Sequence, residues 1–384
     1  MIDPLDQAEA TFAASVDGTV GIEEEFAILD PATLDLAPRF EELSGAASPF
    51  LREHITGELI ASEIEIVSGR GETLEAALAQ QREARHALFA HVGTHGVRLG
   101  ATATHPWADY REQPNIDTEH YRRVVDGLQY VARRNNTFSL HVHVGIQGAD
   151  RAIQVCDRLR AVLPLLLAVS ANSPYLDARD AGLHSARTQS FTKSFPRCGI
   201  PDAYGSWAAY ADYVGFLQRT RSIVEYTQVW WSVRPHFSFG TVEVRICDAQ
   251  STAQESDALS ALITACVLQA AHDLDAGLPD PNEPHRLIEE NMWRAIRHGL
   301  DGELLDLASG DAFPARAAID RLLAWSDPAR AHHTIAEPHF PAQNGAQRQR
   351  RMIEAGADLP EVYAAAVQET HSTYADSDQE ASAA

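Results

Sequence analysis

Four segments of this sequence alternate apolar and polar side chains, and this pattern constrains the fold more than any other feature. Successive side chains of a β-strand point to opposite faces, so each segment predicts a strand with one buried face and one charged face. The segments are Thr19–Leu29, Phe138–Ile146, Trp230–Phe239 and Thr241–Ala249. Their polar rows carry, in that order, Glu23 and Glu25, His141 and His143, Arg234 and His236, and Glu243, Arg245 and Cys247.

The charged faces have two interpretations. A polar strand face often meets only solvent, and this explanation is sufficient for any one segment taken alone. Solvent-facing strand positions usually carry Thr, Ser, Lys or Gln, however, whereas these rows carry carboxylates, imidazoles and guanidinium groups. Carboxylates that are held close together repel one another unless cations neutralise them. Because the pattern occurs four times, it favours a shared metal site.

The rest of the chain contains further strands and several helices. Strands are predicted at Glu58–Val67 and Val97–Thr102, and a tight hairpin at Gly240. Helices are predicted at Thr73–His95, Thr118–Ala132, Ala149–Ser170, Trp207–Arg221, Ala253–Leu274, Pro284–His298 and Ala315–Trp325. The irregular connection Asn172–Pro201 is long, and such loops are often lids or binding loops. Glu24 falls on an apolar row, where it requires an edge position or a buried partner.

Composition limits the class of protein. The formal net charge of −23 repels nucleic acids and anionic lipid. The four cysteines form no C-x-x-C pair, which is typical of free thiols in a reducing compartment. The N-terminus has no signal peptide, and the longest apolar run is roughly half of a membrane span. We therefore predict a cytoplasmic protein with a flexible leader at 1–17, one catalytic domain at 18–370 and a disordered acidic tail at 371–384.

The predicted ligands indicate which metal ion binds and which kind of ligand binds with it. A carboxylate-rich site suits Mg²⁺, and one imidazole shifts the preference slightly towards Mn²⁺. Mg²⁺ held by few carboxylates completes its shell with water and phosphate oxygens, which points to a nucleotide. The sequence has no G-x-x-x-x-G-K-[ST] loop and no G-x-G-x-x-G after a strand. Arg234 and Arg245 are therefore the best candidates for binding its phosphates.

Several motifs together resemble one known family. They are GIEEEF, ITGELIASEIEI, LHVHVG, SANSP, WSVRPHFSFGTVEVRICDAQ and ENMWRA, and they extend from about Thr19 to Arg297. Their order and spacing resemble the glutamate–cysteine ligase type 2 family, carboxylate–amine ligases of the glutamine synthetase-like superfamily. This resemblance implies an α+β fold in which a curved, mainly antiparallel sheet carries helices on its convex face. It also implies that ATP and two or three divalent ions bind on the concave face, and that an acyl phosphate reacts with an amine.

The resemblance also assigns roles to particular residues. It implies the metal ligands Glu23, Glu25, Glu58, Glu65, His141 and Glu243. Arg245 and Arg234 correspond to arginines that bind phosphate and act in catalysis, and His143 supports the ligand histidine. Lys193 is a candidate nucleotide contact, and Arg187 and Thr188 share its loop. Glu58 and Glu65 have opposite strand parity, so a bend must separate them, whereas simple alternation would pair Glu63 with Glu65.

Alternatives remain for the substrate and for the activity. Glutamate and cysteine are the expected small-molecule substrates, and another amine in place of cysteine is compatible with the family. The same residue types also suit a metal-dependent amidohydrolase, which would cleave amides without nucleotide. A non-catalytic sensor of nucleotide or amino acid is the second alternative. The sequence leaves a homo-oligomer open.

Overall fold

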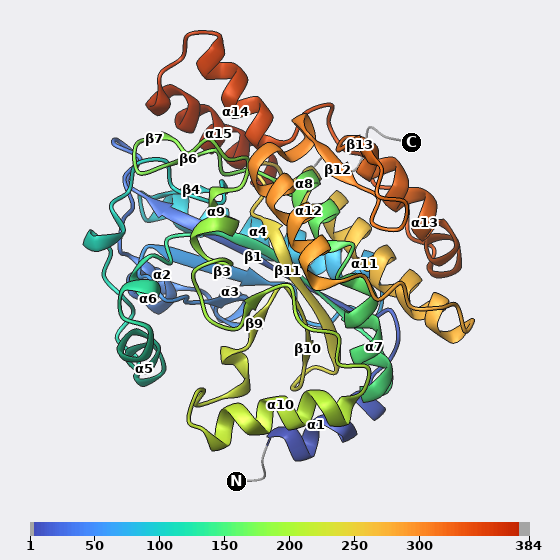
Figure 1. Ribbon diagram of the computed structural model, residues 1–384. Helices are drawn as coiled ribbons and strands as arrows, with labels where there is room; N and C mark the ends of the chain where they lie inside the picture. The colour runs from blue at the N-terminus through green and yellow to red at the C-terminus, as the bar shows by residue number, and fades with distance from the viewer. Residues whose placement is uncertain (1–3, 376–384) are drawn as a thin grey trace.

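A seven-stranded sheet forms the centre of the computed structural model, which describes residues 4–375 (Figure 1). Its strand order is β10-β11-β5-β1-β3-β2, and β4 also pairs with β1. The strands are β1 (Val20–Leu29), β2 (Ile55–Thr56), β3 (Glu63–Val67), β4 (Arg98–Gly100), β5 (Ser139–Gly145), β10 (Val233–His236) and β11 (Thr241–Asp248). Their pairings are antiparallel, which confirms the predicted α+β fold with a mainly antiparallel sheet.

Helices and short strands surround this sheet. The helices are α1 (Pro4–Ala13), α2 (Phe40–Ala46), α3 (Pro49–His54), α4 (Leu74–Thr94), α5 (Glu119–Leu128), α6 (Tyr130–Arg133), α7 (Ala149–Leu159), α8 (Leu163–Ser170), α9 (Ala186–Ser190), α10 (Trp207–Arg219), α11 (Ala253–Asp275), α12 (His285–His298), α13 (Ala317–His333), α14 (Gly345–Glu354) and α15 (Leu359–Tyr374). The short strands pair as β6 (Tyr175–Leu176) with β7 (Arg179–Asp180), β8 (Cys198–Gly199) with β9 (Trp230–Trp231), and β12 (Glu303–Leu305) with β13 (Ala312–Pro314). Single 3₁₀ turns lie at Tyr110–Glu112, Tyr226–Gln228 and Gly299–Asp301.

Helices α4, α7, α8 and α11 pack against the sheet. The predicted apolar rows face them: Val20 and Ile22 of β1 belong to the same hydrophobic core as residues of α7, α8 and α11. Farther along β1, Phe26 packs with Phe89 of α4 in a second core. Burying each such side chain contributes about 1.5–3 kcal/mol, so the apolar rows determine which face the helices cover. The charged rows are left on the other face.

Glu24 has the buried partner that its position on an apolar row required. It points into the helical layer, where Arg85 of α4 donates two hydrogen bonds of 2.7 and 2.8 Å to its carboxylate. Gln81 donates a third at 2.7 Å, and the hydroxyl of Ser256 a fourth. The carboxylate is thus neutralised inside the protein.

The predicted hairpin at Gly240 is confirmed, since β10 and β11 pair on either side of it. Gly240 has a φ of +64°, and a Cβ at this position would lie 3.0 Å from the carbonyl oxygen of Thr11. Both the backbone conformation and the close approach of α1 favour glycine here.

One prediction for β11 is wrong. The alternation placed Cys247 on the polar face beside Arg245, but the pairing of β11 with β5 shifts register between Val244 and Cys247. Cys247 then lies opposite Leu140, and its side chain is fully buried in the main hydrophobic core. A bulge of this kind inserts an extra residue and reverses the facing of those that follow.

Helices pack against the hydrophobic cores near both ends of the described residues. Within the predicted leader, α1 buries Ala8 and Phe12 in the main core, because these residues share one side of the helix. At the other end α15 continues to Tyr374, whose ring packs on Phe26 and Phe89. Residues 376–384 of the predicted tail lie outside the described residues. No helix within 4–375 combines the length and the apolar character needed to cross a membrane.

Candidate active site

Strand register places the predicted site residues directly opposite one another. Glu23 of β1 pairs with His141 of β5, and Glu25 pairs with Glu65 of β3. On the other side of β5, His143 pairs with Glu243 of β11. These residues come from four strands that are distant in sequence, and paired side chains on one face lie about 5 Å apart.

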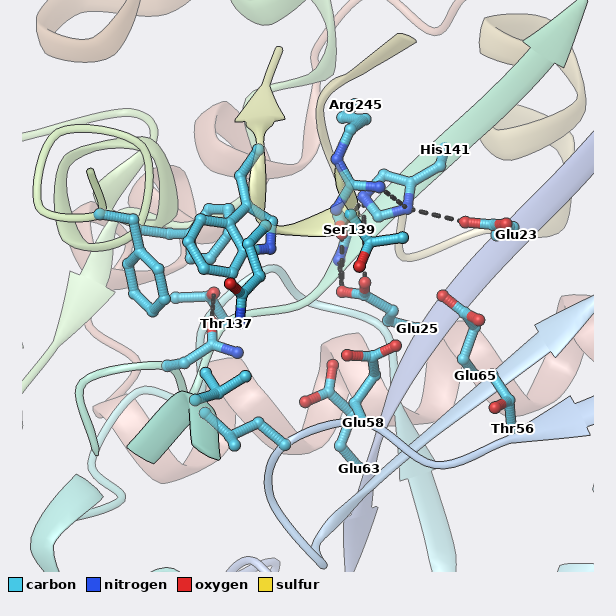
Figure 2. Close-up of a pocket in the computed structure, with 18 of the residues that line it drawn as sticks. Glu23, Glu25, Thr56, Glu58, Glu63, Glu65, Thr137, Ser139, His141 and Arg245 are labelled. Carbon is cyan, nitrogen blue, oxygen red and sulfur yellow. Dashed lines mark hydrogen bonds and ion pairs between the residues drawn. The ribbon is translucent and has the colours of Figure 1, made fainter. Parts of the chain in front are cut away.

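The charged face lines a cavity of about 330 Å³. The predicted residues among its walls are Glu23, Glu25, Glu58, Glu63, Glu65, His141, Arg187, Arg234, Glu243 and Arg245. In Figure 2 the carboxylates of Glu25, Glu58 and Glu63 turn towards one another, with Glu65 beside them. All six predicted metal ligands and both predicted arginines thus line one cavity.

Lys193 is not among the residues that line the cavity, whereas Arg187 of the same loop is. The ammonium group of Lys193 forms an ion pair with Glu289 of α12. Arg187 of α9 does reach the cavity, but its guanidinium donates to the carbonyl oxygens of Ile246 and Arg245 at 3.0 and 3.1 Å. Arg187 therefore holds the backbone of β11, and Lys193 fastens the loop to α12.

One candidate metal position is formed by Glu23, His141 and Glu243, whose ligand atoms lie within 4.8 Å of one another. Arg234 and Arg245 surround it with positive charge. Burial alone would raise the pKa of Glu243, but these two guanidinium groups outweigh it and hold that pKa well below the usual range. Burial also opposes ionisation of Glu23, and His143 and His141 outweigh it, so the pKa of Glu23 is likewise well below the usual range.

A second candidate position is formed by Glu25, Glu65 and His141, again with ligand atoms within 4.8 Å. Here the protein supplies too little positive charge. Burial and the carboxylates of Glu23 and Glu58 raise the pKa of Glu65 well above its usual range. Burial and Glu25 raise the pKa of Glu58 to about 8.

Glu63 adds to the same crowding. Burial, Glu25 and Glu58 raise the pKa of Glu63 well above its usual range. Its Oε2 is buried and has no hydrogen-bond partner among the described residues. An orphaned carboxylate oxygen beside other carboxylates is the environment that a bound cation would satisfy. Glu63 and Glu58 both line the cavity. Glu58 can do so despite its opposite strand parity because it lies before the start of β3.

His141 lies between the two candidate positions. Its Nδ1 lies 3.0 Å from Glu23 Oε2, and its Nε2 lies 2.8 Å from the hydroxyl of Ser139. That hydroxyl also donates to Glu25 at 2.6 Å. Burial and Arg245 lower the pKa of His141, which favours the neutral imidazole that ligates metals. Six carboxylates and one imidazole are a donor set for Mg²⁺ or Mn²⁺, so the residues fit the predicted ions.

The two arginines differ in their freedom to bind a ligand. Arg234 donates to both oxygens of Glu243, at 2.7 and 3.2 Å, and to the carbonyl oxygens of Thr227 and Val229. Arg245 donates to Glu243 through Nη1, while its Nε is buried and unpartnered within the described part of the chain. Arg245 therefore has donors left for a ligand, whereas Arg234 mainly orients Glu243.

Residues 19–370 of this sequence match the Glutamate-cysteine ligase family 2. The chain belongs to this family. A relative from Rubrobacter xylanophilus named "Putative glutamate–cysteine ligase 2-2" is 40% identical over 314 residues, which span 82% of this chain and 81% of the relative. The glutamate–cysteine ligase of Natronomonas pharaonis is 35% identical over 338 residues, or 88% of this chain and 92% of that one. The family resemblance noted in the sequence is thereby confirmed.

A solved structure shows the same fold. The crystal structure of the glutamate–cysteine ligase of Francisella tularensis in complex with AMP superposes with a TM-score of 0.65. The match covers 94% of this chain and 90% of that chain, at 12% sequence identity. Membership in glutamate–cysteine ligase family 2 supports ligase activity, and the solved structure shows the shared fold.

Sequence reasoning missed part of the cavity wall of this family 2 member. Tyr121 of α5 lines the cavity and donates to the carbonyl oxygen of Gly57 at 2.6 Å. Phe191, Phe195 and Trp230 form an aromatic side of the cavity. No motif marked these residues, because they come from a helix, a loop and the short strand β9, whose positions depend on the whole fold. Ser139 was detectable, since it shares the polar row of His141.

Proposed function

We propose that this protein is an ATP-dependent carboxylate–amine ligase that activates the γ-carboxylate of glutamate as an acyl phosphate and joins it to an amine. Cysteine is the expected amine, and ADP and phosphate are the other products. The observation that supports this most directly is the pair of acid-rich groups that share His141 in one cavity, beside an arginine with unused donors. The names of the relatives support the choice of glutamate and cysteine.

The cavity divides into an arginine-rich half and a carboxylate-rich half. Bound Mg²⁺ or Mn²⁺ would neutralise phosphate and carboxylate charges and polarise the transferred phosphoryl group. Glu23, His141 and Glu243 would hold the ion nearest the arginines, so Arg245 can donate to the oxygens of the transferred phosphoryl group there. Arg234 keeps Glu243 in place through its bidentate contact.

The other half suits the amino-acid substrates. Glu25, Glu58, Glu63 and Glu65 would hold further cations, and the same carboxylates attract the ammonium group of an incoming amine. The aromatic side chains of Phe191, Phe195 and Trp230 exclude water from an acyl phosphate, which water would otherwise hydrolyse. The two halves meet at His141, where the phosphorylated carboxylate would lie within reach of the amine.

The test is a product assay with purified protein, Mg·ATP and pairs of amino acids, in which ADP and the mass of the ligated product are followed. We expect ADP release that depends on both amino acids and that EDTA abolishes. Glu243→Gln and Glu23→Gln should abolish turnover, whereas Lys193→Ala should leave it within about threefold, as expected for a surface ion pair. Lys193 is a matched control because it is a charged residue of the same domain that pairs outside the cavity.

Each alternative gives a different result in this assay. Release of AMP and pyrophosphate would exclude the acyl-phosphate route. Amide cleavage without nucleotide would replace the ligase with an amidohydrolase. Normal turnover in Glu243→Gln would contradict the assignment of the site.

A further inference from the structure

Three histidines cluster outside the cavity, at the ends of two helices. His272 lies in the last turn of α11, and His332 and His333 lie in the last turn of α13. Their ligand nitrogens lie within 4.8 Å of one another. Nε2 of His333 and Nε2 of His272 are 3.4 Å apart. Nothing in the proposed ligase reaction uses these residues.

We propose that these three imidazoles form a second metal site, for a divalent transition metal of the Zn²⁺ type, which cross-links α11 to α13. Imidazole ligands favour Zn²⁺, Ni²⁺, Co²⁺ and Cu²⁺ over Mg²⁺. Zn²⁺–N bonds of about 2.0–2.1 Å in tetrahedral geometry separate two ligand nitrogens by about 3.3–3.4 Å. The nitrogens of His272 and His333 therefore already have the separation that two ligands of one Zn²⁺ ion require.

The two helices hold this geometry through contacts one turn before the cluster. Helices α11 and α13 pack along each other at the right of Figure 1. Pro328 lies inside α13, where it interrupts the helical hydrogen bonds. The backbone N–H of Ala329 instead donates to Oε1 of Gln269 on α11 at 3.0 Å. This contact sets the register of the helices and brings His333 next to His272.

The ring of His333 is also oriented from its other side. A Cβ on Gly18 would lie 3.2 Å from Nδ1 of His333, so the backbone of Gly18 packs against that edge. Gly18 has a φ of +81°, which also favours glycine. With Nδ1 directed at Gly18, Nε2 is directed at His272.

The electrostatic surroundings favour a cation. A helix C-terminus carries partial negative charge from the helix dipole, and the C-terminal ends of α11 and α13 converge here. His91 and His95 of α4 provide a contrast. His91 Nε2 lies 3.0 Å from the carbonyl oxygen of Leu43, and His95 Nδ1 lies 2.9 Å from the carbonyl oxygen of His91. Both of these histidines therefore have a backbone hydrogen-bond partner.

Zinc binding to the untagged full-length chain tests this proposal. Calorimetry should detect a Zn²⁺ ion whose affinity falls at least about tenfold in His272→Gln and His333→Gln. The double variant His91→Gln/His95→Gln, with the same change of residue type on another helix, should bind as the native chain does. The catalytic variant Glu65→Gln should keep this ion, which separates it from cations in the cavity. X-ray absorption of that variant should show nitrogen ligands.

A stability measurement completes the test. Zn²⁺ should raise the thermal midpoint of the native chain and of Glu65→Gln, but not that of His333→Gln. His332→Gln serves as a second variant, because His332 is exposed and its replacement leaves the packing intact. Affinities within twofold of the native value in all three histidine variants would overturn the proposal. So would an equal rise of the midpoint in native chain and variants, and either result would leave the 3.4 Å contact as an imidazole hydrogen bond.

Discussion

Glu24 and Glu25 are neighbours on β1 and are almost equally buried, with 4% and 7% of their surfaces exposed, yet they lie in opposite environments. Glu24 faces the helices and accepts two hydrogen bonds from the buried guanidinium group of Arg85. Glu25 faces the cavity, where Glu63 and Glu65 lie beside it. Burial of a carboxylate therefore does not mark function in this protein. What separates the two faces is whether the protein itself supplies the neutralising charge.

The pKa values of the two faces show the same contrast. Burial raises the pKa of a carboxyl on both faces. For Glu24 the guanidinium of Arg85 outweighs burial, and the pKa falls below its usual value. For Glu65 the neighbouring carboxylates act with burial, and the pKa lies well above its usual range. The helical face is complete without a ligand, whereas the cavity face has an excess of negative charge that a cation would offset.

The largest effect is expected from removing the buried ion pair on the helical face. Arg85→Ala removes the partner of Glu24 and one partner of Asp257, which lies 2.7 Å from Nη1. The free energy of unfolding should fall by about 3–5 kcal/mol, because a buried charge is left uncompensated. Urea denaturation measures this change.

Arg82→Ala is the matched control for this experiment. Arg82 lies one turn away on α4 and also pairs with Asp257, at 3.1 Å, but 44% of its side chain is exposed against 2% for Arg85. Its removal should cost about 1 kcal/mol or less. Equal losses in the two variants would show that burial of the Glu24 pair is not what stabilises this face.

The next largest effect is expected on the cavity face, where a substitution should raise the free energy of unfolding. Glu65→Gln removes one of the crowded charges, so the metal-free protein should become more stable by at least about 1 kcal/mol near pH 8. Ligase turnover should fall at least about 100-fold, since a proposed cation ligand is lost. Urea denaturation in EDTA and the ADP assay measure the two quantities.

Glu24→Gln sharpens this result, because it makes the same change on the other face of the sheet. It should destabilise the protein by about 1–3 kcal/mol, since Arg85 loses its charged partner. Loss of stability in both variants would mean that the cavity carboxylates are neutralised by the protein after all.

The alternating rows of the sequence predicted this division of the sheet, since facing in a strand depends only on local geometry. Glu24 was the informative exception, but its partner Arg85 lies on a helix 61 residues farther along the chain, and no local pattern connects them. The same limit explains the error at Cys247. A bulge depends on how β11 pairs with β5, and a single strand sequence does not show it.

The candidate site was predictable where it lies on strands and less so where it lies on loops. Glu23, His141 and Glu243 follow from strand parity, and the register then places them together. Glu58 precedes β3, so parity could not decide between it and Glu63, and both line the cavity. Lys193 was predicted as a nucleotide contact because it lies in the long connection Asn172–Pro201, but a position in a long loop does not determine which way a side chain points.

The smallest expected effect is a pH dependence that only the cavity face should produce. The folded protein keeps protons on Glu58, Glu63 and Glu65 at pH values where the unfolded chain has lost them, because their pKa values are raised, that of Glu58 to about 8. The folded state then binds more protons, and the free energy of unfolding falls as pH rises. Buried histidines such as His105, whose pKa is lowered to about 4, act in the opposite direction only below about pH 6.5.

A comparison between pH 6.5 and 8 therefore reports on these carboxylates together with His143, which acts in the same direction because Glu23 and Glu243 outweigh burial and raise its pKa. In EDTA the free energy of unfolding should fall by about 1 kcal/mol or more across this interval. Saturating Mg²⁺ should flatten or reverse the slope, because a cation binds the deprotonated cluster and stabilises the folded state more as pH rises. Glu65→Gln should reduce the slope in EDTA, whereas Arg82→Ala should keep it. A slope that is the same with EDTA and with Mg²⁺ would mean that the crowded face does not bind the cation, and the contrast between Glu24 and Glu25 would then concern folding alone.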